Sequence, residues 1–487
     1  MASAVTAPSR PATDAVGVDA PGRRWVVPAC TLAVLVLYAV AALLGGRDAT
    51  GTDFHRLQAR ALADGHLDIR PVPAALAALD DPYDPVANLD VRVEDGVQDL
   101  AYRDGRLYSA HGLTTPLLLL PAELLVGTSP PNWAITLLGG WCGVLAGAWT
   151  LVQVRRRWIP TLSDAALGSA VLASGLCGPA WVLMSTANGY EAAIAVASGL
   201  TMLGSALLLR ATEHLPALGR GRAALGTGCL ALAVGARPTA VVTAIVVAVA
   251  AAAVLVVRRQ AADAPGSTRA TALDLGAVVG PFLAVGALIA VSNVARFGSA
   301  TEFGFGYQLS VWDMTAYPKG RLAYLAPNLA DYLAAAPRPT GAFPWIGLRG
   351  TVGGIRPQDH TSEPIVGLVF LAPVLVVGLA ALATSARQIR SCAAGLAVVA
   401  LTATTTGAAA LVAVSLPFNT STLRYAADAT PMLLLAACIG WAWAHTHPTA
   451  DADDRVGAAG GRRAVDVAWV AALVVGIALT AAVQVGA

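Results

Sequence analysis

Charged side chains are scarce in this sequence of 487 residues. Only 13% of the residues are Asp, Glu, Lys or Arg, whereas 56% are hydrophobic, and an ordinary soluble domain carries about 25% charged residues. This shortage excludes a soluble globular protein of average composition and indicates a chain whose main solvent is the lipid bilayer. The 32 basic and 30 acidic residues nearly balance, so net charge gives no sign of a nucleic-acid partner.

Lysine and cysteine are also rare. Lys319 is the only lysine, so the other basic side chains apart from histidine are arginines. Six cysteines fall inside or at the start of apolar runs: Cys30, Cys142, Cys177, Cys229, Cys392 and Cys438. This placement is typical of small buried hydrophobic side chains and disfavours a disulfide framework or a metal site.

The first apolar run extends from Trp25 to Leu44, about the twenty residues needed to cross the hydrocarbon core. Residues 1–22 have no periodic apolar pattern, and we expect a disordered cytoplasmic tail there. A cleaved signal peptide is the alternative for this region. The run is long for a signal peptide and has no clear small-residue cleavage site, which favours a retained first helix.

Further apolar runs predict an all-α polytopic membrane protein of about 10–11 transmembrane helices. The stretch 223–257 contains Arg237-Pro238, which breaks a helix, so we predict a helical hairpin or two short helices there. The other runs lie at 132–154, 163–183, 190–209, 273–295, 364–383, 392–415, 427–444 and 465–485.

Arginine placement predicts the topology. With a cytoplasmic N-terminus, every short inside loop is basic, as the positive-inside rule requires. The arginines concerned are Arg155, Arg156, Arg157, Arg210, Arg220, Arg222, Arg258, Arg259, Arg269, Arg387, Arg390, Arg455, Arg462 and Arg463. This topology holds only if the run 113–126 does not cross the membrane. At fourteen residues, interrupted by two prolines and Glu123, it is expected to be an interfacial or re-entrant helix.

The predicted topology divides the chain into four parts. After the tail, residues 23–295 form an N-terminal transmembrane module whose first outer loop spans 46–131. Residues 296–363 form a second long outer loop, and residues 364–487 hold the C-terminal helices. Loops of this length are usually functional, and we expect short helices on the membrane surface within them. The sequence shows no internal repeat, which disfavours transporters built from inverted repeats.

The first outer loop carries the clearest sequence pattern. Asp53 follows the first helix by about eight residues and precedes a short amphipathic pattern. The loop ends in the stretch DGRLYSAHG, at 104–112, and leads into PLLLLP at 116–121. These features resemble the GT-C superfamily of membrane glycosyltransferases, in particular the protein mannosyltransferase and aminoarabinose transferase branch, with family 39-like bacterial members. Further similar stretches are Asn188–Glu191, Gly235–Thr239, Arg296–Ser299, Glu302–Gly304, Tyr307-Gln308, Arg424-Tyr425, Asp428 and Pro431.

The resemblance implies a GT-C-like bundle that moves a hexosyl or pentosyl group from a polyprenyl-phosphate donor to an acceptor hydroxyl on the outer face of the cell membrane. Such a transfer needs a base, cations for the departing phosphate and an apolar groove for the lipid. The first-loop acid of the family matches Asp53, which is the candidate base. The alternatives for this residue are a solvated loop acid or a helix N-cap, because Thr52 and Asp53 precede a helical pattern.

Glu191 is the second candidate acid, since it opens a spanning helix, where a charge is costly. It would assist the acceptor or hold a divalent ion; the alternative is a charge favoured by the helix dipole. The family's usual pair of adjacent acids is absent, because Thr52 and Phe54 flank Asp53. No cofactor or metal ligand is therefore assigned, and a requirement for Mg²⁺ or Mn²⁺ stays open. Asp80–Asp84 lacks the EF-hand spacing and favours an ordinary Asp-Pro turn.

Arg237 and Arg424 are the candidate phosphate ligands, because guanidinium groups match phosphate oxygens. Arg237 pairing with a neighbouring carboxylate, and Arg424 extending to the membrane surface, are the alternatives. Tyr425 lies beside Arg424, and Tyr108, His111 and Lys319 are further candidates for contacts with the sugar or phosphate.

The expected partners are the lipid-linked donor, membrane lipid, and a polysaccharide, lipid or protein acceptor. A polytopic transporter or lipid-linked-sugar flippase is the main alternative, and a non-catalytic scaffold for envelope assembly is a third. A transporter predicts charges buried mid-helix along a pathway, whereas polar residues here gather in the outer loops, which favours the enzyme.

Overall fold

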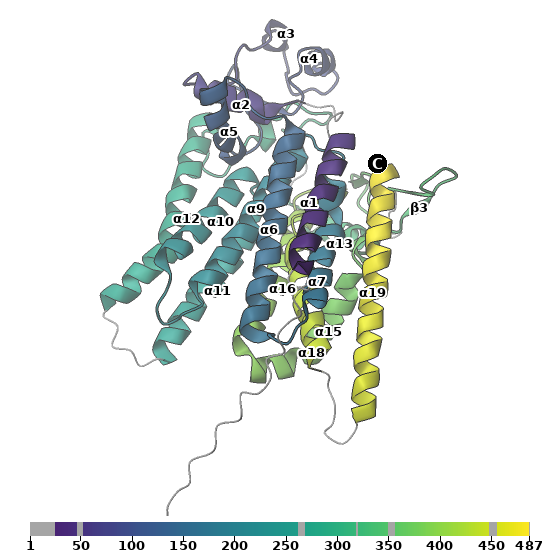
Figure 1. The fold of residues 1–487 in the computed structure, drawn as a ribbon. Helices are drawn as coiled ribbons and strands as arrows, with labels where there is room; N and C mark the ends of the chain where they lie inside the picture. The colour runs from purple at the N-terminus through teal and green to yellow at the C-terminus, as the bar shows by residue number, and fades with distance from the viewer. Residues whose placement is uncertain are drawn as a thin grey trace, which may run out of the picture.

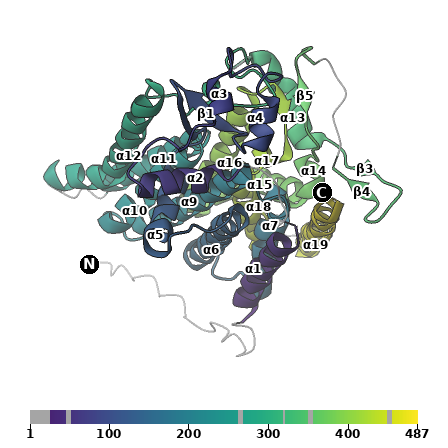
Figure 2. The same ribbon diagram turned by 90° about the horizontal axis from the view of Figure 1, so that it is seen from above.

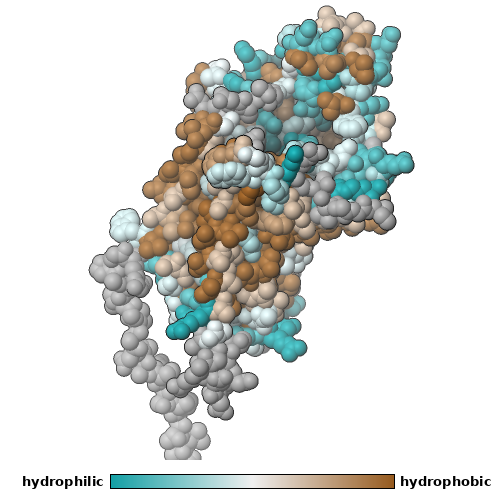
Figure 3. Space-filling model, turned by 90° about the vertical axis from the view of Figure 1, so that its right-hand side faces the viewer, coloured by the Kyte–Doolittle hydropathy of each residue, from teal (hydrophilic) through white to brown (hydrophobic). Residues whose placement is uncertain are grey.

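A computed structural model describes residues 25–45, 52–261, 268–317, 320–348, 356–447 and 455–486. Helices make up 69% of the structure, and the described strands form three small two-stranded sheets. The prediction of an all-α polytopic membrane protein is confirmed. Apolar side chains cover the middle of one face of the molecule, while hydrophilic side chains gather at its two ends (Figure 3).

Seven of the described helices are long and apolar enough to cross a membrane. They are α1 (Val26–Leu44), α6 (Asn132–Trp158), α9 (Gly189–Ala211), α11 (Ala240–Ala261), α12 (Thr268–Phe297), α16 (Ala394–Ser415) and α19 (Arg455–Gly486). Four shorter or more polar helices pack among them, namely α7 (Asp164–Leu176), α10 (Arg220–Ala236), α15 (Val374–Cys392) and α18 (Thr430–Thr446). Each corresponds to an apolar run of the sequence.

Small residues bring α6 against α9. A Cβ atom on Gly139 would lie 2.5 Å from the backbone of Ala195, and a Cβ on Gly199 would lie 2.5 Å from the carbonyl oxygen of Gly139. Helices in lipid associate through such close backbone packing, because lipid removes most of the hydrophobic force between them. The glycines therefore set the spacing of this helix pair.

Two predicted spans were wrong where a local break interrupts them. The span 163–183 ends early, because Gly178 has a φ of +117° and Pro179 begins a separate short helix, α8 (Pro179–Val182). The span 364–383 is shifted along the chain, because Pro373 separates α14 (Leu368–Leu371) from α15, which continues to Cys392. The expected break at Arg237-Pro238 is confirmed, since α10 ends at Ala236 and α11 begins at Ala240.

The first long loop folds over one end of the bundle (Figures 1 and 2). It contains α2 (Phe54–Ala63), α3 (Ala74–Ala77), α4 (Leu89–Glu94), the antiparallel strands β1 (Leu100–Arg103) and β2 (Arg106–Ser109), and α5 (Thr114–Val126). The Asp81 and Asp84 carboxylates accept from the backbone N–H groups of Tyr83 and Val86 at 2.9 and 2.8 Å. The expected turn at 80–84 is thereby confirmed.

The second long loop lies beside the first. It contains the short 3₁₀ helices η2 (Phe305–Tyr307) and η3 (Leu322–Tyr324), α13 (Leu325–Ala334), and the antiparallel strands β3 (Arg338–Pro339) and β4 (Ile346–Gly347). Its strand β5 (Thr361–Ser362) pairs in parallel with β6 (Thr420–Ser421), which precedes α17 (Leu423–Ala426). The two loops meet where the Leu309 N–H donates to the Leu100 carbonyl at 2.8 Å.

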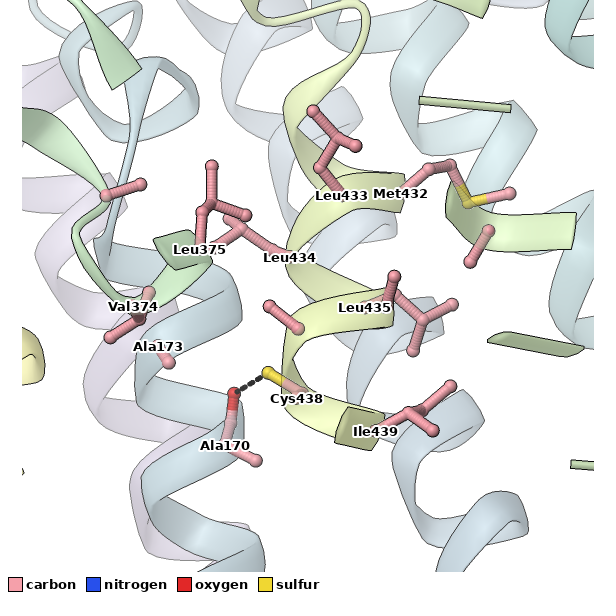
Figure 4. Close-up of a cluster of buried hydrophobic side chains, with 14 of the residues drawn as sticks. Ala170, Ala173, Val374, Leu375, Met432, Leu433, Leu434, Leu435, Cys438 and Ile439 are labelled. Carbon is pink, nitrogen blue, oxygen red and sulfur yellow. Dashed lines mark hydrogen bonds between the residues drawn. The ribbon is translucent and has the colours of Figure 1, made fainter. Parts of the chain in front are cut away.

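Helix α18 forms the centre of the largest apolar core. Leu434 points toward Leu375 of α15, whereas Met432 and Leu435 point to the opposite side of the helix, and the Cys438 thiol donates to the Ala170 carbonyl oxygen of α7 at 3.5 Å (Figure 4). Cys177, Cys229 and Cys438 are buried as expected, whereas Cys392 is exposed, because it lies at the C-terminal end of α15 next to Arg390.

Candidate active site

Arg237 and Asp428 form a buried ion pair between the break of the α10–α11 hairpin and the segment joining α17 to α18. Arg237 Nε lies 2.7 Å from Asp428 Oδ2, and the two side chains are only 8% and 10% exposed. The Thr239 hydroxyl donates to the same carboxylate oxygen at 3.0 Å. The structure therefore gives Arg237 the carboxylate partner that the sequence left as an alternative.

Arg424 lies close to Arg237 and is linked to it by Tyr425. The guanidinium carbons of Arg237 and Arg424 lie 5.1 and 5.9 Å from the Tyr425 ring centroid. Arg424 Nη2 pairs with Glu363 at 2.9 Å, and Nη1 lies 4.0 Å from Glu191. Its Nε is buried and has no hydrogen-bond partner within the described part of the chain.

Tyr190 connects this site to both long loops. The Arg424 guanidinium lies 4.9 Å from the Tyr190 ring centroid. The His111 ring of the first loop meets the same ring edge to face at 5.0 Å, and Gln308 of the second loop donates to the Tyr190 hydroxyl at 2.6 Å. We call Tyr190, Glu191, Arg237, Arg424, Tyr425 and Asp428 the arginine cluster.

Glu191 is buried and takes part in a capping box at the start of α9. Its carboxylate accepts from the Asn188 N–H at 3.3 Å, and the Asn188 side chain accepts from the Tyr190 N–H at 2.8 Å. A carboxylate in the first turn also interacts favourably with the helix dipole. Glu191 therefore has the helix-start position that the sequence offered as one alternative, and it also lies beside Arg424.

Two buried histidines approach the cluster from the first loop. Burial lowers the pKa of His55 to about 4, and its Nε2 lies 3.0 Å from the Gly189 carbonyl oxygen. Burial lowers the pKa of His111 well below its usual range, and nearby His55, Arg237 and Arg424 lower it further. Both rings are therefore neutral near pH 7. Among the described residues, no partner contacts Nε2 of His111.

Asp53 lies at the N-terminal end of α2, one residue before Phe54, whose ring stacks on His111 at 4.5 Å. Its Oδ2 is 2.7 Å from Arg56 Nη1, and its Oδ1 accepts from Asn132 Nδ2 at 2.7 Å. Although it occupies the N-cap position, its side chain makes no capping hydrogen bond to the described backbone. The carboxylate is 39% exposed, so it is oriented by two neighbours and still reachable.

A glycine lets the loop carrying Asp53 reach α9. A Cβ atom on Gly189 would lie 2.3 Å from the Phe54 ring, closer than any real contact. Phe54 is buried between α2 and the start of α9. The absence of a side chain at Gly189 therefore allows α2 to dock beside Tyr190.

The remaining predicted residues lie apart from the cluster. Tyr108 is 4% exposed and packs against Phe297, with ring centroids 5.5 Å apart, in a small core with Ala101 and Ala110. Leu107 and Tyr108 are neighbours in β2 and point to opposite faces of the strand, yet both are buried. Neither face of β2 is therefore open to a substrate at this point. Lys319 lies outside the described residues.

An apolar groove leads away from the cluster. One small cavity is lined by Thr239, Asp428, Pro431 and Met432. A second shares Met432 with it and lies between α9, α11 and α16, where it is lined mainly by aliphatic side chains such as Val247 and Val398. We call these two cavities together the α9–α11 groove. Within the described ranges, no group of three His, Cys, Asp or Glu side chains is placed to hold a metal ion.

No protein-family model matches the sequence, and no curated protein matches it. Two of the solved structures that show some likeness to this chain are the following. One is ArnT from Cupriavidus metallidurans bound to undecaprenyl phosphate, with a TM-score of 0.46 and 15% identity over 95% of this chain and 76% of that chain. The other is the oligosaccharyltransferase AglB from Archaeoglobus fulgidus in complex with an inhibitory peptide and a dolichol-phosphate, with a TM-score of 0.45 and 11% identity. In this second comparison the matched region covers 95% of this chain but only 56% of AglB.

Proposed function

We propose that this protein is a membrane glycosyltransferase that moves a sugar from a polyprenyl-phosphate donor to an acceptor hydroxyl, with inversion at the anomeric carbon. The observation that carries the proposal is the placement of Arg237 and Arg424 beside the Tyr425 ring, with Asp428, the ion-pair partner of Arg237, lining the α9–α11 groove. Two guanidinium groups beside an apolar groove fit a phosphate attached to a long hydrocarbon chain.

The phosphate binds Arg424 in this proposal. Arg424 has a buried Nε without a partner among the described residues and is otherwise paired with Glu363 at the surface. The Glu363 side chain is 44% exposed, so the entering phosphate can displace it. Arg237 is already neutralised by Asp428, and it supports the site through its contact with the Tyr425 ring.

Asp53 acts as the base. The acceptor oxygen attacks the anomeric carbon, its proton passes to Asp53, and the bond from that carbon to the phosphate oxygen breaks. The leaving group is polyprenyl phosphate, whose additional charge Arg424 stabilises. Although Arg56 and Asn132 each contact one carboxylate oxygen of Asp53, a carboxylate oxygen has two lone pairs, so both can still accept a proton.

In this proposal the acceptor is a polysaccharide, lipid or protein hydroxyl. The site lies on the outer face of the membrane, and the N-terminus lies inside. This orientation is supported by the distribution of arginines along the sequence and by the gathering of the polar loops at the end of the bundle that holds the arginine cluster (Figure 1).

The test is a transfer assay with the full chain in lipid nanodiscs and a panel of radiolabelled polyprenyl-phosphate sugars. The Asp53→Asn variant should lose about a hundredfold or more of the turnover, the usual contribution of a positioned base. Asp64→Asn is the matched control, because Asp64 is an exposed acid at the other end of α2. Unchanged turnover in Asp53→Asn would remove it from the base role, and lipid movement across the membrane without transfer would identify a flippase.

A further inference from the structure

The hairpin of β3 and β4 presents two exposed aromatic rings at its tip. Phe343 is 69% exposed and Trp345 is 62% exposed, and the rings meet edge to face with centroids 5.1 Å apart. The turn is closed by backbone hydrogen bonds, from the Thr340 N–H to the Trp345 carbonyl at 2.9 Å and from the Trp345 N–H to the Ala342 carbonyl at 2.7 Å. The rings are thus held together on a defined turn.

The hairpin is attached to the bundle beside the last helix. Strand β4 contacts α19, and Ile346 packs against the main core. The hairpin projects sideways from the bundle, level with the C-terminal end of α19 (Figure 1), and seen from above it extends beyond the surrounding helices (Figure 2). Since the apolar span of α19 ends at Val485, the aromatic tip lies near the level where the hydrophobic part of this span ends.

The exposed surface of α19 identifies the partner. Beyond the exposed Arg462 and Arg463 near its start, the large exposed side chains of α19 are aliphatic: Val467, Val470, Val474, Val475 and Val485. Such side chains on a membrane-spanning helix face lipid, and the aromatic tip continues this lipid-facing surface to the end of the span. Tryptophan and other aromatic rings are favoured at this level of a membrane, where their apolar bodies enter the lipid and their polar atoms stay near water.

We propose that Phe343 and Trp345 insert into the headgroup region of the bilayer beside α19 and anchor the second long loop to the membrane surface. The partner is membrane lipid. Because Glu363 belongs to the same loop and pairs with Arg424, the anchor also restrains the segment that borders the arginine cluster. The inference requires only that α19 spans the bilayer, and it does not depend on the proposed sugar transfer.

The test places a fluorescent bimane label at position 345 of the full chain in nanodiscs that contain nitroxide-labelled lipids. The Trp345→Cys substitution is made together with Cys392→Ser, because Cys392 is an exposed cysteine that would also react. Val86→Cys is the matched control, since Val86 is an apolar residue that is 81% exposed in the segment between α3 and α4, at the far end of the first loop (Figure 1).

We expect headgroup nitroxides to quench the label at position 345 about threefold more than the label at position 86, and more than nitroxides deep in the acyl chains do. Equal quenching at the two positions would overturn the proposal. So would magnetic coupling between spin labels at position 345 on two chains, because a second copy would then cover the tip. If Trp345→Cys does not elute as a monodisperse protein, Ala342→Cys, in the same turn, carries the label and is judged by the same outcomes.

Discussion

The Glu363 carboxylate lies 2.9 Å from Arg424 Nη2 and closes the exposed side of the arginine cluster. The backbone N–H of Glu363 donates to the Ser421 carbonyl at 2.9 Å, so the main chain is held while the half-exposed side chain can turn. Arg237 and Arg424 face three carboxylates, those of Glu191, Glu363 and Asp428. A bound phosphate would add further negative charge. We therefore expect the most exposed carboxylate, that of Glu363, to move away from Arg424 when the phosphate binds.

Glu363→Gln should therefore bind the donor more tightly. Removing the charge that competes for Arg424 is expected to lower the donor KM by about fivefold, the upper range for a partly exposed ion pair. The assay is donor titration in nanodiscs at a fixed acceptor concentration. Glu302→Gln is the control, because Glu302 lies in the same loop and accepts from the Gly304 N–H at 2.7 Å. A higher donor KM in Glu363→Gln would show that Glu363 supports donor binding instead.

The Arg237–Asp428 pair should be essential for stability. Asp428→Asn leaves the guanidinium buried without a counter-charge, which is expected to cost about 3 kcal/mol of unfolding free energy. The double variant Arg237→Met with Asp428→Leu removes both charges and should recover most of that stability, while transfer activity stays low. The destabilisation of Asp428→Asn is measured as a lower temperature at which monodisperse protein is lost on heating. Asp64→Asn, at an exposed position, is the control. Equal thermal stability of Asp428→Asn and the unmodified protein would contradict this assignment.

The helical architecture follows from local sequence features. Apolar runs of about twenty residues and the Arg237-Pro238 break are visible within short windows, and the structure has helices at each of them. The two misplaced helix ends arise at Gly178 and Pro373, where a local break interrupts an apolar composition that continues on both sides. Hydropathy alone does not locate the end of a helix inside a continuous apolar stretch.

The site was only partly predictable, because its contacts join distant segments. Asp428 lies 191 positions from Arg237, and Gln308 lies 118 positions from Tyr190. A single sequence shows that such residues are polar but not which of them meet. In the sequence Tyr190 is only one residue of the stretch Asn188–Glu191, although its ring contacts both His111 and Arg424 in the structure. An aromatic residue between Asn188-Gly189 and Glu191 was the available signal.

The stability of the protein should fall in acid because of its buried histidines. A histidine whose folded pKa is lowered binds its proton more readily in the unfolded chain, so stability is complete above the unfolded pKa of about 6.5 and is lost as the pH falls toward the folded value. For His55, with a pKa of about 4, the loss at pH 5 is about 2 kcal/mol.

The measurement compares thermal stability at about pH 7.5 and about pH 5. His55→Gln keeps a hydrogen-bond donor near the Gly189 carbonyl and removes the titrating ring, so its stability should change less between the two conditions. His66→Gln, at an exposed histidine in the same loop, should behave like the unmodified protein. An unchanged acid sensitivity in His55→Gln would show that other groups cause it.

Asn132 should act as a positioning residue for the Asp53 base. Its Nδ2 donates to Asp53 Oδ1 at 2.7 Å, and Asn132 is the first residue of α6. It therefore connects the carboxylate to a transmembrane helix, whereas Arg56 belongs to α2, the helix that follows Asp53 directly. Asn132→Ala should lower kcat by about tenfold to a hundredfold with little change in donor KM, because a small displacement of a reacting group has an effect of this size.

Asn132→Asp separates positioning from a merely structural role. A second carboxylate at this distance disfavours ionisation of both, so the acidic limb of the kcat–pH profile should move to higher pH. Gln153→Glu is the control, since Gln153 is a buried amide farther along α6 that donates to Ala206. If Asn132→Asp lowers the yield of folded protein but leaves the kcat–pH profile in place, Asn132 serves only to attach α2 to the bundle. A shifted profile, with the control unshifted, connects the amide directly to the group whose ionisation limits turnover.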